Sequence, residues 1–202
     1  MAATAGVATP IVARRVGQSA QGNAYERRLS EKAAQTFLIG TPVAIDPATG
    51  FVYECPAIVS VATAVVAGVS VENASNLTTS GVPKTITLPN APQNQPSAVI
   101  IPGGVPPNDG TVGFVVADDA TEFIGVLGGS VTDADGTIAQ TDLGALFGLT
   151  KDATTNYWYV DKDKTTAAGG WCVVITGFVD PVGTLHGRVI FRFIKAAQQL
   201  SV

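Results

Sequence analysis

The chain has 202 residues, of which 46% are hydrophobic and only 14% are charged, and its formal net charge is −4. One histidine and two cysteines are too few for a structural zinc site, a haem attachment or an iron–sulfur cluster, so the sequence indicates no metal and no cofactor. Because so few side chains are charged, small uncharged residues must fill the surface. That composition is typical of a protein that contacts other proteins.

The sequence also bears on the compartment of the protein. Cys55 and Cys172 lie far apart in the chain. The sequence leaves open whether they pair, and buried free thiols are the simpler interpretation. At the N-terminus the arginines follow the apolar residues, which is the reverse of their order in a secretory signal. The uncharged, valine-rich stretch 55–71 is interrupted by proline, serine and glycine, so we expect strands there, and a soluble intracellular protein without a membrane partner.

Charge is distributed unevenly along the chain. Residues 1–35 carry five basic and two acidic side chains, whereas residues 36–150 carry one basic and ten acidic side chains. A nucleic-acid-binding protein would show a basic stripe with interspersed aromatic residues, so no nucleic-acid partner is expected. The basic N-terminal arm, residues 1–35, either stays solvated or lies along an acidic neighbour. In the second case its candidate contact residues are Arg14, Arg15, Arg27 and Arg28.

One short helix is predicted within this arm. Asn23 can cap it, and Glu26, three residues later, can bond back to the amide of the cap residue. Good helix formers follow as far as Ala34. The only other helical pattern lies at 142–149.

From Thr36 onward, alternating hydrophobic residues predict strands. The residues Phe37, Ile39, Val43 and Ile45 share one parity, and the turn-forming segment 46–50 follows them, so 36–55 is predicted as a hairpin. Further strands are predicted at 64–71, 84–88, 97–101, 111–117, 122–128, 157–161, 171–179 and 187–194. Short strands separated by turn signals predict an all-β fold. We expect an antiparallel β-barrel or β-sandwich with an extended N-terminal arm.

Prolines are concentrated in residues 81–107, which contain seven of them. Proline has no backbone N–H to donate, so this segment is predicted as a long extended loop around short edge strands. It supplies three further candidate contact residues, Pro92, Pro96 and Pro106. We divide the chain into the arm 1–35, a β domain 36–128 that includes this loop, and a C-terminal β region 129–202. The sequence leaves open whether the last two form one composite domain.

Candidate catalytic residues are few. His186 is the only histidine, and a Ser–His–Asp arrangement would need it beside a carboxylate such as Asp180. No GxSxG motif and no glycine-rich phosphate loop ahead of a helix is present. The segment 131–142 matches a calcium loop only in part, and a turn built on Asp135-Gly136 accounts for the same residues. The sequence therefore predicts a protein that is not an enzyme.

An aromatic cluster offers a different function. Tyr157, Trp158 and Tyr159 are consecutive, and Trp171 begins the next predicted strand. Exposed aromatic rings of this kind can bind carbohydrate. On a strand, however, alternate residues point to opposite faces, so at least one of these faces is expected to be core or a subunit interface.

Several segments resemble tailed-bacteriophage capsid decoration (cement) proteins, namely GTPVAIDPATGFVYE (40–54), VAGVSVENASN (66–76), GALFGLTKDATTNYWYVD (144–161) and VVITGFVDPVGTLHGRVIFRF (173–193). The resemblance implies a β-rich subunit, commonly a homotrimer, that is assembled in the host cytoplasm and sits on the outer capsid surface of the virion. There it would bind the major capsid protein and stabilise the shell against the pressure of packaged DNA. The family has no catalytic residues to carry over.

Other functions stay open from the sequence. One is a carbohydrate- or receptor-binding β module of a virion fibre or surface adhesin. A tail-tube or minor head protein would also fit the composition, and an enzyme that uses His186 ranks behind both.

Overall fold

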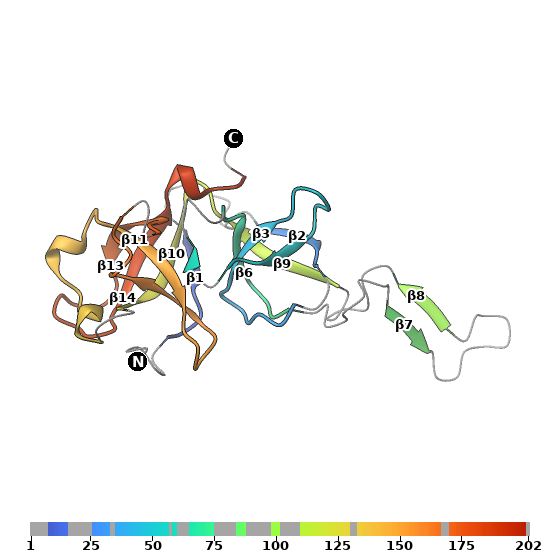
Figure 1. Cartoon of the computed structure of the whole chain (residues 1–202), viewed down its shortest axis with the longest axis horizontal. Helices are drawn as coiled ribbons and strands as arrows, with labels where there is room; N and C mark the ends of the chain where they lie inside the picture. Colours follow the sequence, from blue (N-terminus) through green and yellow to red (C-terminus); the bar gives the residue numbers. More distant parts are fainter. Residues whose placement is uncertain are drawn as a thin grey trace.

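The computed structural model describes residues 8–15, 26–32, 35–56, 58–59, 65–74, 84–87, 98–101, 110–129, 133–166 and 170–200. Across these ranges the protein is all-β, with strands in sheets of seven, five and two, three short 3-10 turns and no α-helix. The molecule is elongated, with a barrel of C-terminal strands at one end, the five-stranded sheet in the middle and the hairpin β7–β8 at the other end (Figure 1). The prediction of an all-β fold with a barrel is confirmed.

The seven-stranded sheet closes on itself. It contains β1 (Val12–Arg15), β5 (Ile58–Val59), β10 (Thr121–Gly128), β11 (Leu146–Lys151), β12 (Trp158–Asp161), β13 (Val173–Phe178) and β14 (Arg188–Phe193). The ring runs β10-β12-β11-β13-β14 and returns to β10. Only the pair β10–β12 is parallel, while β1 and β5 pair with β10 and β11 outside the ring. We call this unit the C-terminal barrel.

The five-stranded sheet is antiparallel and strongly curved. Its order is β2 (Glu26–Ser30), β9 (Thr111–Val116), β6 (Gly68–Ser70), β3 (Pro42–Ile45) and β4 (Val52–Glu54). A bridge between Glu31 and Val52 brings its two edge strands together, and the Lys32 N–H donates to the Val52 carbonyl at 2.7 Å. We call this unit the curled sheet. The separate hairpin consists of β7 (Lys84–Thr87) and β8 (Ala98–Ile101).

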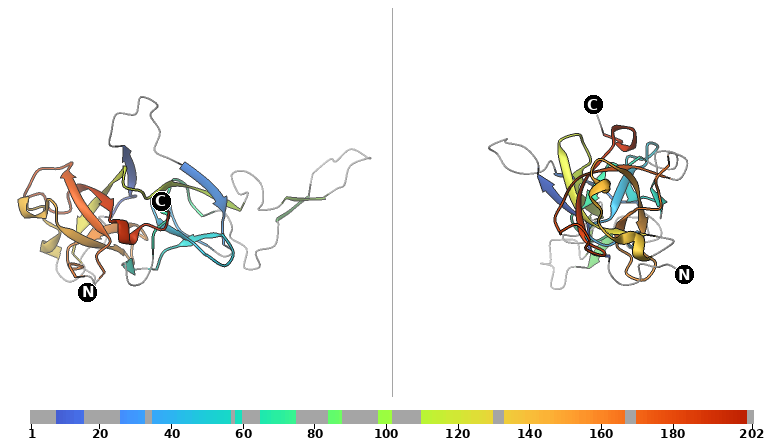
Figure 2. Two further views of the ribbon diagram at one scale, coloured as in Figure 1. Left: turned by 90° about the horizontal axis from the view of Figure 1, so that it is seen from above. Right: turned by 90° about the vertical axis from the view of Figure 1, so that its left-hand side faces the viewer.

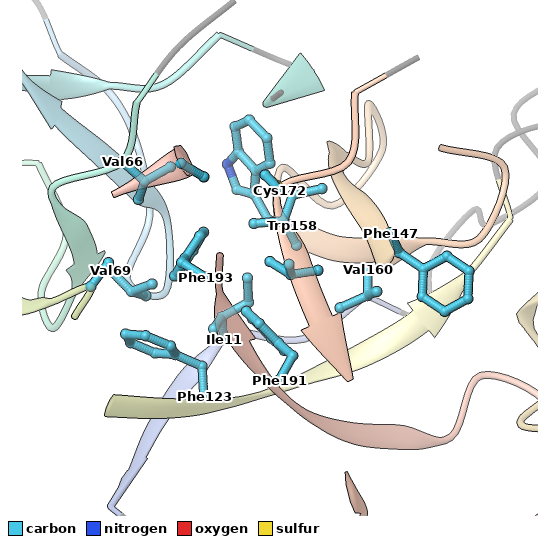
Figure 3. Close-up of a cluster of buried hydrophobic side chains, with 14 of the residues drawn as sticks. Ile11, Val66, Val69, Phe123, Phe147, Trp158, Val160, Cys172, Phe191 and Phe193 are labelled. Carbon is cyan, nitrogen blue, oxygen red and sulfur yellow. The ribbon is translucent and has the colours of Figure 1, made fainter. Parts of the chain in front are cut away.

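The curled sheet buries apolar residues on both faces because successive residues of a strand alternate between them. One cluster lines its inner face and consists of Phe37, Val43, Val52, Ala67, Val112, Phe114 and Val116. The other face contributes Ala44, Val69 and Val115 to the core of the C-terminal barrel. Figure 3 shows Val69 of the curled sheet in one cluster with Phe123, Phe191 and Phe193 of the C-terminal barrel. These three rings pack with centroids 5.4 to 5.9 Å apart, so one core joins the two units.

The predicted hairpin at 36–55 is confirmed. β3 and β4 pair in register from Val43↔Glu54 to Ile45↔Val52, and the Gly50 N–H donates to the Asp46 carbonyl at 2.7 Å in the turn. Phe37 and Val43 are buried as their parity predicts, but Ile39 of the same parity is 39% exposed. Every other predicted strand overlaps an observed one.

The predicted helix in the arm is wrong. Residues 26–30 form β2, which pairs with β9 from Glu26↔Val115 to Ser30↔Thr111. The edge of β9 offers main-chain hydrogen bonds to these residues, and that tertiary pairing outweighs a local preference of a few tenths of a kcal/mol per residue. The proposed cap, Asn23, lies outside the described residues.

The helix that the pattern at 142–149 indicates is also absent, again because these residues pair with distant strands. Only Gln140–Asp142 form a 3-10 turn, and Leu146–Lys151 form β11, which has β12 on one edge and β13 and β5 on the other. The described parts of the arm are divided between the two units, because β1 joins the C-terminal barrel and β2 joins the curled sheet. The chain crosses between the units again at 117–120, between β9 and β10. The division at residues 35 and 128 stays a prediction.

Candidate contact surface

The two strands of the arm lie on the surface of their own chain. β1 pairs with β10 from Val12↔Ile124 to Arg15↔Thr121, and β2 pairs with β9. In β1 the side chains of 12–14 are exposed, and in β2 those of 26–28 are exposed. Main-chain hydrogen bonds therefore hold both strands, while most of their side chains are turned to the surface, where a partner can reach them.

The arm supplies the arginines among the candidate contact residues. Arg14 and Arg27 are exposed, and Arg28 is exposed with its guanidinium 2.8 Å from Glu72 and 2.9 Å from the Thr111 hydroxyl. Arg15 ends β1, where only its backbone is described. The proline candidates Pro92, Pro96 and Pro106 lie outside the described residues.

The basic arm faces acidic groups of its own body. In addition to the Arg28–Glu72 pair, Lys32 Nζ lies 3.4 Å from an Asp46 oxygen, and Arg14 lies opposite Glu122 in the sheet register. The Ala48 N–H and then Lys32 lower the pKa of Asp46. Exposed pairs of this kind contribute at most about 1 kcal/mol, so an arginine can change partners at little cost. Part of the charge asymmetry in the sequence is thus matched within one chain.

An apolar groove of about 240 Å³ lies beside the arm, between the two units. Its lining comes from Ile11–Ala13, Ile39, Val69–Val71 and Val115. Val12, Ile39 and Val71 are 49%, 39% and 36% exposed there, which is high for large aliphatic residues. Sequence reasoning missed this groove because four separate segments form it. Ile39 has the parity of a buried strand residue, and only the structure shows that it is exposed.

His186 and Asp180 take structural roles in the β13–β14 connection. His186 has a φ of 52°, and its Nδ1 lies 3.4 Å from the Leu127 carbonyl oxygen. Asp180 accepts hydrogen bonds from the Arg188 backbone N–H at 2.7 Å and from its guanidinium at 2.8 and 3.0 Å. The Arg188 side chain and backbone lower the pKa of Asp180 to about 2. This carboxylate therefore ties the turn to β14.

Two further carboxylates, Asp118 and Asp119, accept hydrogen bonds from other groups of the chain. Asp118 accepts from the Ala120 N–H at 3.0 Å and the Thr121 hydroxyl at 2.7 Å, whereas Asp119 accepts from Gln198 Nε2 at 3.0 Å.

In the segment that resembles a calcium loop, residues 133–136 form a 3-10 turn. Asp142 accepts from the Ala139 N–H at 2.8 Å and from Lys162 Nζ at 3.0 Å. Within the described ranges no three metal-ligating side chains are grouped together.

The aromatic cluster lies mostly in the core. Trp158 and Tyr159 are 0% and 3% exposed. The Trp158 indole N–H donates to Glu54 Oε1 at 3.4 Å, and Lys151 Nζ lies 2.7 Å from the same oxygen. Tyr157 and Trp171 are half-buried, so a carbohydrate site on these strands would have only those two rings.

Both cysteines are free thiols in the core shared by the two units. Burial raises the pKa of each thiol well above its usual value, since the charged thiolate would be stripped of water. Neither side chain is in a position to act as a nucleophile.

The chain was compared with known protein families, curated proteins and solved structures. No protein-family model, no curated protein and no solved structure matches it. In the part of the chain that is described, no helix is long and apolar enough to cross a membrane.

Proposed function

We propose that the protein is a non-enzymatic virion structural protein, a decoration subunit that binds the outer surface of the major capsid protein lattice. In this role it stabilises the shell against the pressure of packaged DNA and acts as a homotrimer. The observation that carries the proposal is the pair of fused β units with exposed arm strands and an apolar groove beside them. The sequence resemblance supplies the identity of the partner.

The chemistry of the described side chains agrees with a role in adhesion. Asp180, the carboxylate considered as a partner of His186, binds Arg188 of its own chain, and Asp118, Asp119 and Asp142 likewise bind backbone or side-chain groups of their own chain. A protein that acts by contact needs a stiff scaffold and surface area, and it needs no tuned acid or base. A contact of roughly 1,600 Å² in total is enough for a specific interface. A trimer gains further because its second and third contacts form intramolecularly.

We assign the capsid contact to the arm and to the proline-rich segment 81–107. The arm presents Arg14 and Arg27 at the surface. Within the proline-rich segment, β7 and β8 form a hairpin that stands clear of both units in Figure 1 and in the left view of Figure 2. A two-stranded hairpin is marginally stable alone in water, so packing against a partner would stabilise it.

Binding to undecorated shells tests the proposal. Deletion of residues 2–22 is unsuitable, because it removes β1 and the buried Ile11 from the core. Charge reversal at Arg14 and Arg27 leaves the core intact, and Arg192→Glu is a matched control on the exposed face of β14. Purified protein would be mixed with shells of the accompanying major capsid protein and sedimented, and its free mass measured by light scattering.

We expect the wild-type protein and the control to sediment with the shells, and the Arg14→Glu/Arg27→Glu double variant to bind at least about tenfold more weakly, because attraction to acidic groups becomes repulsion. Wild-type protein that stays in the supernatant would overturn the decoration function. If the double variant binds as well as the control, the assignment of the capsid contact to the arm is overturned, while the decoration function is not. Glycan-dependent tryptophan fluorescence in a protein that ignores shells would favour the carbohydrate-binding alternative.

A further inference from the structure

The segment that follows β14 crosses from the C-terminal barrel to the curled sheet. It begins with the 3-10 turn η3 (Lys195–Ala197) and continues to Leu200. Ala197 is fully buried in the barrel core, whereas Leu200 packs against the cluster on the inner face of the curled sheet. In Figure 1 and in the left view of Figure 2 this segment, drawn in red, lies over the junction of the two units. We call residues 195–200 the C-terminal clasp.

The clasp pairs with the curled sheet through its main chain. The Val66 N–H donates to the Ala197 carbonyl at 2.7 Å, and the Gln199 N–H donates to the Val66 carbonyl at 2.9 Å. A parallel bridge between Val66 and Gln198 results. Val66 leads into β6, so the clasp extends the sheet at the point where β6 begins.

The Gln199 side chain binds the main chain of Ile45, the last residue of β3. β6 pairs with β3 only at Pro42 and Val43. The main-chain groups of Ile45 that face β6 therefore lie beyond Gly68, the first residue of β6. The Ile45 N–H donates to Gln199 Oε1 at 2.7 Å, and Gln199 Nε2 donates to the Ile45 carbonyl at 2.5 Å. The primary amide thus replaces the peptide group that a longer β6 would have supplied.

Gln198 fastens the clasp to the barrel side. Its side chain is 5% exposed, and Nε2 donates to the Phe193 carbonyl at 2.9 Å and to Asp119 Oδ1 at 3.0 Å. Asp119 belongs to the 117–120 connection between β9 and β10. Two neighbouring glutamines therefore bind opposite sides of the junction.

We propose that the C-terminal clasp is a conformational lock. It couples the two units and covers the end of the β3–β6 pairing in the curled sheet. Release of the clasp leaves the main-chain groups of Ile45 and Val66 unpaired at that end, and unpaired main-chain groups of this kind are a template for pairing with another chain. The proposal rests on this geometry and does not depend on the capsid role.

Residue-resolved amide exchange by NMR tests the lock with a point variant, Gln199→Ala. The matched control is Gln140→Ala, because Gln140 is an exposed glutamine in the 3-10 turn η2 (Gln140–Asp142). In the Gln199→Ala variant we expect exchange about tenfold faster at Ile45 and at Val66 and Ala67, a factor that corresponds to about 1.4 kcal/mol. Exchange in β13 and β14 should keep its wild-type rate. The control should match the wild type throughout.

A chain that ends at Ile194 removes the whole clasp. We expect it to self-associate in light scattering beyond the state of the full chain, because the main-chain groups of Ile45 and Val66 are then unpaired. Faster exchange confined to Ile45 would show that Gln199 makes only a local bond, and it would overturn the proposal. Wild-type exchange in Gln199→Ala would overturn it as well. If the shortened chain does not fold, the point variant decides.

Discussion

The arm is part of the folded core as well as of the surface, and Ile11→Ala measures how much stability it contributes. Ile11 is 2% exposed, although it lies just ahead of the edge strand β1. In Figure 3 it lies beside Phe191. Gly125 in β10 lies against both residues, since a Cβ at this position would lie 3.1 Å from Phe191 Cε1 and 3.4 Å from Ile11 Cγ1.

The expected loss of stability follows from this burial. An Ile→Ala change in a core costs roughly 2–5 kcal/mol through lost transfer energy and the cavity that remains. We expect about 3 kcal/mol at Ile11, since an edge position can relax more than the barrel centre can. In a chain of this length, each kcal/mol lowers the Tm by about 2–4 °C, so the Tm should fall by roughly 6–12 °C. Val12→Ala is the matched control: Val12 is 49% exposed, and its substitution should change stability by less than about 0.5 kcal/mol.

Thermal unfolding followed by circular dichroism would compare the two variants with the wild type. If Ile11→Ala and Val12→Ala melt within about 1 °C of each other, the arm is not part of the cooperative core. The charge-reversal variants at Arg14 and Arg27 would then have to be interpreted as changes in a detachable segment.

Two further predictions concern titratable groups. The folded-state pKa of Asp180 is about 2, below its usual value, so the Asp180–Arg188 contact stabilises the fold above about pH 4 and this contribution is lost as the pH falls through about 2. The wild-type Tm should therefore exceed that of Asp180→Asn at pH 7, and the difference should shrink between pH 4 and pH 2; a difference independent of pH would contradict this. Cys55 and Cys172 should react with Ellman's reagent only after unfolding in guanidinium, because both are buried thiols with raised pKa values. Rapid reaction of either thiol in native buffer would show that the core opens readily.

The sequence predicts the elements whose signals are local. The 36–55 hairpin has a strand period and turn residues within one short stretch, and it is present as β3 and β4. In the final strand, β14, Val189, Phe191 and Phe193 are buried on one face and Arg188 and Arg192 are exposed, while Ile190, on the face of the arginines, is buried as well. In such segments a single buried face determines both the pattern and the structure.

The candidate site was predictable only in part. Exposed arginines on the arm follow from its composition, and three of them, Arg14, Arg27 and Arg28, lie at the surface. The groove beside them was not predictable, because Ile11, Ile39, Val69 and Val115 approach one another only through the packing of the two units.

The sequence by itself determined the all-β fold class, the short strands and most of the turns, since these depend on neighbouring residues. Only the tertiary structure decided that Glu26–Ser30 is a strand and that the last residues clasp the curled sheet. Both outcomes depend on main-chain groups that are distant in the sequence, those of β9 in one case and those of Ile45 and Val66 in the other. Almost any residue can make main-chain hydrogen bonds, whatever its side chain. The local sequence therefore does not indicate which distant strand will supply their partners.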